Sequence, residues 1–67
     1  MLEHQKRVET ERDELYEKLQ KLSNFLHDGE AKKVCISQVE HDRMSRQEMI
    51  MKLYVHILTE RIQAFKL

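Results

Sequence analysis

Four histidines and one cysteine are the side chains of this 67-residue chain that most often take part in metal binding or covalent catalysis. The histidines, which we interpret as surface residues, are scattered along the sequence: His4, His27, His41 and His56. No two of them have the spacing at which one face of a helix holds a metal ion. The sequence also contains no glycine-rich phosphate loop and no nucleophile elbow. We therefore predict that the protein is not an enzyme and that it binds no metal ion and no cofactor.

Cys35 is the single cysteine, so no disulfide can form within the chain. This is typical of a protein in a reducing compartment. Its neighbour Lys33 could perturb the thiol, but the sequence places no general base nearby. We interpret Cys35 as a small apolar side chain.

A set of charged residues follows one side of the first predicted helix, next to its apolar seam: Arg7, Glu11, Glu14, Lys18 and Lys21. In the second predicted helix, Arg61 lies beside Tyr54 at the rim of the core. Cations at such positions usually pack their stems on apolar neighbours and pair with carboxylates. Alternatively, cations from neighbouring copies converge on an anionic ligand, with a tyrosine or histidine stacked on a base. The sequence leaves both interpretations open.

The overall charge and hydropathy narrow the classes of partner. Lysine plus arginine and aspartate plus glutamate each total 12, so the formal net charge is zero with the histidines neutral. This balance disfavours binding to a nucleic-acid polymer. The longest apolar run is far too short to cross a membrane, and the charged start is unlike a secretory signal. We therefore expect a cytoplasmic protein that does not bind membranes.

The elements that must position these residues are two helices. Apolar residues recur at intervals of seven, four, three and four positions: Val8, Leu15, Leu19, Leu22 and Leu26. This spacing predicts one seam on a helix over about 3–27. Asp28 and Gly29 favour a turn, and residues 28–37 form the connection. Ser37 followed by Glu40 is a capping box, which predicts a second helix over about 38–65.

The second helix carries two apolar stripes, of which a single antiparallel partner helix can cover one. The predicted core stripe contains Met44, Gln47, Met51, Tyr54, Val55, Leu58, Ile62 and Phe65. Folding the chain back at about residue 32 sets Val8 near Leu58 of this stripe. A polar strip that includes Glu48, Lys52 and His56 is expected on the far side. The remaining apolar residues, which we call the outer stripe, are Met49, Ile50, Leu53 and Ile57.

An uncovered apolar stripe usually marks an interface, and a chain this small gains stability from a partner. The most economical partner is a second copy. The expected fold is therefore all-α: one antiparallel two-helix hairpin over 1–67 that assembles into a homo-oligomeric helical bundle through the outer stripe.

The order of residues resembles a known family. Small phage-encoded helical hairpins, including the anti-CBASS and Thoeris anti-defence sponge proteins, have an R-V-x-x-E-x-x-x-L-x-x-K-x-x-x-L-x-x-F helix and a Q-x-x-x-M-x-x-Y-x-x-x-L-x-x-R-I helix. Here these patterns are met by Arg7, Val8, Glu11, Leu15, Lys18, Leu22 and Phe25, then by Gln47, Met51, Tyr54, Leu58, Arg61 and Ile62.

The resemblance implies a phage counter-defence protein that sequesters cyclic di- or trinucleotide second messengers without catalysis. It would act as a homo-oligomer, a hexamer in the characterised sponges, in the cytoplasm of the infected bacterial host. The ligand would lie between protomers. By this resemblance, Lys18 would contact phosphate and Arg7 would also bind the ligand. His4 would occupy the place of a base-stacking aromatic residue, and Arg61 would form a second anion site.

The alternative function is a phage protein-interaction module. In that case the outer stripe docks as a helix into a groove on a host protein. The methionines of the "MIM" segment suit such an adaptable surface. A stable homo-oligomer that buries the outer stripe would count against this alternative.

Overall fold

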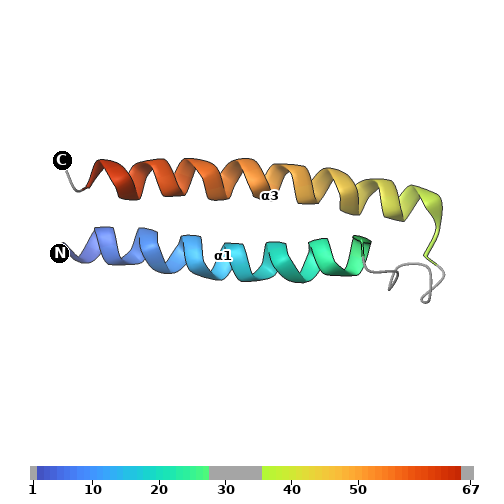
Figure 1. The fold of residues 1–67 in the computed structure, drawn as a ribbon, viewed down its shortest axis with the longest axis horizontal. Helices are drawn as coiled ribbons and strands as arrows, with labels where there is room; N and C mark the ends of the chain where they lie inside the picture. The colour runs from blue at the N-terminus through green and yellow to red at the C-terminus, as the bar shows by residue number, and fades with distance from the viewer. Residues whose placement is uncertain (1, 28–35, 66–67) are drawn as a thin grey trace.

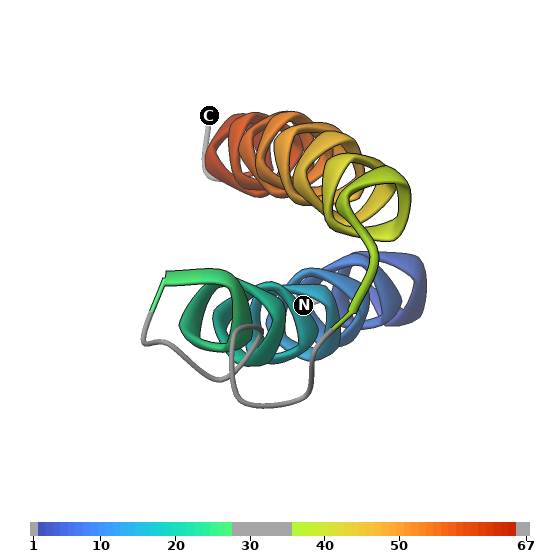
Figure 2. The ribbon, with the colours of Figure 1, turned by 90° about the vertical axis from the view of Figure 1, so that its right-hand side faces the viewer.

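The computed structural model describes residues 2–27 and 36–65 of the chain. Helices α1 (Glu3–His27) and α3 (Gln38–Ala64) run antiparallel and side by side along their whole length (Figure 1). Seen along its long axis, the hairpin is two neighbouring rods with no third layer (Figure 2). In the described residues there is no strand, so the predicted all-α hairpin is confirmed.

Local sequence signals set the ends of the helices. Ser37 has extended backbone angles, and its hydroxyl accepts a hydrogen bond from the Glu40 amide at 3.1 Å, as expected of an N-cap. The second helix ends at Ala64, where Phe65 caps it and donates its amide to the Arg61 carbonyl at 3.3 Å. The expected turn at Asp28 and Gly29 lies outside the described residues, as does Cys35.

The core lies in the seam between the two helices. Its buried apolar side chains are Val8, Leu19 and Leu26 from α1 and Leu58 and Ile62 from α3. Leu58 is completely buried and packs in one cluster with Val8 and Ile62. Leu15 and Phe65 cover the sides of this cluster. The pairing of Val8 with Leu58 is the one expected from folding the chain back at its middle.

The seam of α3 differs from the predicted core stripe at three positions. Gln47 is exposed and 43% of the Tyr54 surface is accessible, whereas Glu48 is buried with only 6% accessible. The prediction that Glu48 faces away from α1 is therefore wrong. Glu48 can occupy the seam because Ser23 and His27 of α1 bind its carboxylate there.

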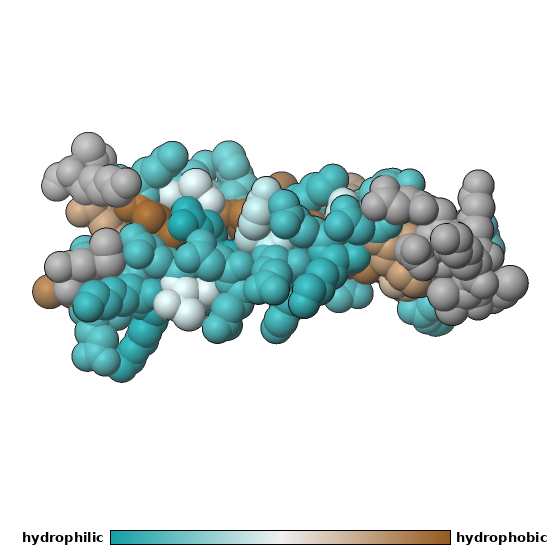
Figure 3. Space-filling model, turned by 60° about the horizontal axis from the view of Figure 1, so that its bottom comes forward, coloured by the Kyte–Doolittle hydropathy of each residue, from teal (hydrophilic) through white to brown (hydrophobic). Residues whose placement is uncertain are grey.

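The outer stripe is uncovered in the single hairpin. Met49, Ile50, Leu53 and Ile57 keep between 53% and 66% of their surface accessible. By contrast, the α1 side of the molecule is mostly hydrophilic, with apolar residues concentrated along the line between the helices (Figure 3). Neither of the two described helices is long and apolar enough to cross a membrane.

Candidate functional site

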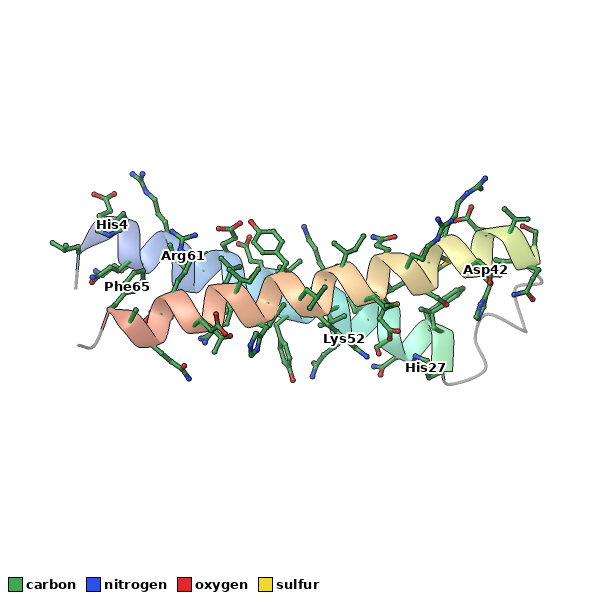
Figure 4. The ribbon with its side chains drawn as sticks, turned by 90° about the horizontal axis from the view of Figure 1, so that it is seen from above. His4, His27, Asp42, Lys52, Arg61 and Phe65 are labelled. Carbon is green, nitrogen blue, oxygen red and sulfur yellow. The ribbon has the colours of Figure 1, made fainter. Side chains whose placement is uncertain are left out.

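The residues expected to bind a ligand lie on one flank of the hairpin and at its open end. His4 is in the first turns of α1, where its ring meets the Phe65 ring edge-on, with 6.0 Å between the ring centres. Figure 4 shows His4, Phe65 and Arg61 gathered at this end, while Lys52 lies toward the opposite edge. The open end thus combines an aromatic pair with a nearby guanidinium group.

Arg7 lines a shallow hollow of about 430 Å³ on the outside of α1, together with Glu3, Lys6, Thr10, Glu11 and Glu14. The Arg7 Nη2 atom lies 3.4 Å from the Glu3 Oε1 atom, and both side chains are more than three-quarters exposed. A surface pair of this kind contributes little stability. The Arg7 guanidinium is therefore free to exchange Glu3 for a more strongly charged anion.

A hydrogen bond between the two helices lies on the same flank as Arg7. The Tyr54 hydroxyl donates to the Glu11 Oε2 atom. This bond raises the pKa of Tyr54, with smaller contributions from burial and from the Glu11 charge, while the Arg61 charge opposes the shift. Tyr54 therefore remains a hydrogen-bond donor at neutral pH, and its ring is fixed beside Arg61.

Lys18 lies on the same side of α1 but three turns further along. Eleven residues separate it from Arg7 in the sequence, which corresponds to roughly 16 Å along the helix axis. The structure therefore brings together His4, Arg7 and Arg61 at one end and leaves Lys18 apart within one hairpin. A ligand of modest size would need a second copy to meet all four residues.

A polar cluster that the sequence pattern did not predict lies on the other flank, around the buried Glu48. Glu48 accepts a hydrogen bond from the Ser23 hydroxyl at 2.5 Å, and its Oε2 atom lies 3.1 Å from the His27 Nε2 atom. The Ser23 hydrogen bond is the main cause that lowers the pKa of Glu48, helped by His27 and Lys52 and opposed by burial. The sequence contained one signal for the burial of Glu48. Glu48 lies three residues before Met51 and seven before Val55, and this helical spacing puts it on the same face as these seam residues.

This cluster predicts an acid-sensitive contribution to stability. Because folding lowers the Glu48 pKa below its ordinary value of 4.5, the contribution is complete above that value and is lost as pH falls through the folded-state pKa. In urea unfolding followed by circular dichroism, we expect Glu48→Gln to be less stable than the wild type at pH 7. The difference should shrink as the pH falls below 4.5, through the folded-state pKa of Glu48.

Glu14→Gln, which removes an exposed carboxylate, is the control for the loss of one negative charge. A difference between wild type and Glu48→Gln that stays constant from pH 7 to well below pH 4.5 would contradict the role of the Glu48 charge.

The described residues offer binding groups on both flanks of the hairpin. No set of three histidine, cysteine, aspartate or glutamate side chains is placed there to hold a metal ion. A second groove of about 350 Å³ lies on the flank opposite Arg61 and is lined by Arg12, Asp13, Tyr16, Val55 and Thr59. The Arg12 Nε atom is already paired with Asp13 at 2.9 Å. The other flank, which carries Arg7, Glu11, Lys18, Tyr54 and Arg61 and which we call the charged flank, is therefore the stronger candidate for a ligand-binding site.

Comparison with known proteins agrees with the resemblance seen in the sequence. A family model described as Sequestin matches residues 2–64. The chain is also 41% identical over 66 residues to an uncharacterized 7.5 kDa protein from the denB–rIIB intergenic region of Enterobacteria phage T4. That match covers 98% of this chain and the whole of the phage protein. No solved structure matches the chain significantly.

Proposed function

Because the chain belongs to the Sequestin family, we propose that it is a phage counter-defence protein that sequesters cyclic nucleotide second messengers of bacterial anti-phage signalling. It holds the ligand between protomers of a homo-oligomer in the cytoplasm of the infected host and performs no chemistry on it. The family name itself denotes sequestration, which is a binding role, and the phage T4 relative supports a phage origin.

One observation carries this proposal: the exposed cation Arg61 borders the exposed outer stripe on the same helix. Arg61 stands one turn beyond Ile57, the last residue of the outer stripe. When copies associate through the outer stripe, the charged flanks of different chains come together at the edges of the interface. Cations that are separated within one chain, such as Arg7 and Lys18, then face a shared space.

The residue types suit a cyclic nucleotide. The flexible ammonium of Lys18 is a point charge for a phosphodiester, and the planar guanidinium groups of Arg7 and Arg61 bind phosphate oxygens through two hydrogen bonds. His4 and the exposed ring of Tyr54 offer surfaces on which a base can stack.

The test is thermal unfolding and calorimetry with a panel of cyclic di- and trinucleotides and cyclic ADP-ribose isomers. A ligand at 100 times its dissociation constant should stabilise the native state by about 2.7 kcal/mol, because it binds only that state. We expect Lys18→Ala and Arg61→Ala to reduce this stabilisation. Lys52→Ala removes a cation from the opposite edge and is the matched control (Figure 4).

Absence of binding across this panel at high micromolar protein would refute the proposal. Equal losses in Lys18→Ala and Lys52→Ala would instead refute the assignment of the site to the charged flank.

The second candidate function is docking of the outer stripe on a host protein. Its support is the exposure of Met49, Ile50, Leu53 and Ile57, which form a continuous apolar surface on α3. A homo-oligomer that buries this surface would leave no room for such a partner. A monomeric chain that binds no cyclic nucleotide would favour docking over sequestration.

A further inference from the structure

The charged flank contains more carboxylates than a phosphate-binding surface needs. Glu3, Glu11 and Glu14 line the same hollow as Arg7, so a ligand that offers only anionic groups is repelled as well as attracted there. A ligand with hydrogen-bond donors in addition to phosphates would use both kinds of side chain. In a nucleotide, the donors are on the base.

Glu11 is the carboxylate best placed to accept such donors, because its orientation is fixed. The Tyr54 hydroxyl crosses from α3 to bind its Oε2 atom. A carboxylate has about four lone-pair directions on its two oxygens, so this bond leaves both oxygens able to accept further hydrogen bonds. An acceptor that is held in place before binding loses less entropy when the ligand arrives.

The bases differ in what they offer to a carboxylate. Guanine presents two adjacent donors, N1–H and the N2 amino group, which match the two oxygens of one carboxylate. Adenine and cytosine each present one amino group next to a ring nitrogen that is an acceptor, and this nitrogen faces a carboxylate oxygen unfavourably. Uracil has one N–H between two carbonyl acceptors.

We propose that Glu11, oriented by Tyr54, is the specificity-determining residue of the site and selects guanine-containing cyclic nucleotides. This inference rests on the proposed sequestering function. The guanine edge binds both oxygens of Glu11, while Arg7, which lines the same hollow, and Arg61 of α3 contact the phosphates. Tyr54 has two roles, since its hydroxyl orients the carboxylate and its partly exposed ring lies beside the base.

The experiment compares the binding of cyclic di-GMP, cyclic di-AMP and cyclic di-IMP to the wild type and to Glu11→Gln by calorimetry. We expect the wild type to prefer cyclic di-GMP over cyclic di-AMP by about tenfold to a hundredfold, as for other two-bond contacts to a base. Cyclic di-IMP, which lacks the N2 amino group, should fall between them.

Glu11→Gln makes the test sharper, because a glutamine amide offers one acceptor and one donor. That pair mismatches the two donors of guanine and matches the amino group and ring nitrogen of adenine. We therefore expect the variant to lose the preference for cyclic di-GMP and to bind cyclic di-AMP more tightly than the wild type does. Its side-chain oxygen can still accept from Tyr54, so the fold should be kept. Glu14→Gln, in the same hollow, should keep the wild-type preference.

The outcomes separate this inference from the function on which it rests. If no ligand of the wider panel of cyclic di- and trinucleotides and cyclic ADP-ribose isomers binds, the sequestering function and the inference both fail. If only ligands without guanine bind, the inference alone fails. If they bind with equal affinity, or if Glu11→Gln keeps the guanine preference, the inference alone fails.

Discussion

Leu58→Ala should strongly destabilise the hairpin and lower the urea concentration at which it unfolds. Leu58 is the one described side chain that is completely buried, and it joins Val8 and Ile62 in the cluster that holds the helices together. Removing a buried leucine side chain to alanine destabilises a protein by about 2 to 5 kcal/mol. A domain of this length has a total stability of roughly 3 to 10 kcal/mol, so the loss is a large part of the whole.

The measurement is urea unfolding followed by helical circular dichroism at one fixed protein concentration, because the proposed assembly would make stability depend on concentration. Val39→Ala is the matched control, since Val39 is an apolar residue of the same helix with 59% of its surface accessible. It should change the midpoint little. If Leu58→Ala unfolds at the wild-type urea concentration, the seam does not hold the hairpin together as described.

Periodicity was enough to predict the fold. Apolar steps of three and four residues define the seam of α1, and the Ser37 cap marks the start of α3. Leu58 and Val8 were expected to pair because folding an antiparallel hairpin back at its middle fixes which turns face each other. Such predictions succeed because the spacing of apolar residues within one helix is enough to indicate which of its faces is buried.

Pattern could not predict the polar part of the seam. Glu48 was assigned to the solvent because a charged residue is normally exposed, and its burial depends on Ser23 and His27, which are distant in the sequence. Tyr54 was assigned to the core for the complementary reason, as an aromatic residue with apolar spacing. Its hydroxyl instead binds Glu11 at the rim. In both errors the partner of the side chain lies on the other helix, and the residue pattern of one helix carries no information about such a partner.

The same limit applies to the candidate site. Sequence resemblance indicated His4, Arg7, Lys18 and Arg61, and the structure shows how they are distributed: three near the open end and Lys18 three turns away. Whether they meet depends on neighbouring copies. The assembly is therefore the step on which any shared site depends, and the outer stripe is the surface that would form it.

Leu53→Asp and Ile57→Asp should each dissociate the assembly into single hairpins and abolish cyclic nucleotide binding. Leu53 is 65% exposed and Ile57 is 53% exposed in the hairpin, so a charge at either position is well solvated in a single chain. In an apolar contact between copies, the same carboxylate would be buried without a partner, which is strongly unfavourable. Sedimentation velocity should show the change from oligomer to monomer.

Gln63→Asp is the control, because it adds a carboxylate to an exposed position of α3 that lies outside the outer stripe. It should sediment like the wild type. An unchanged sedimentation coefficient in Leu53→Asp would show that copies associate through another surface. A monomeric Leu53→Asp variant that still binds the ligand with wild-type affinity would mean that one hairpin holds a complete site. The separation of Lys18 from Arg7 along α1 argues against that result, because a ligand bound to one chain would have to span roughly 16 Å to reach both.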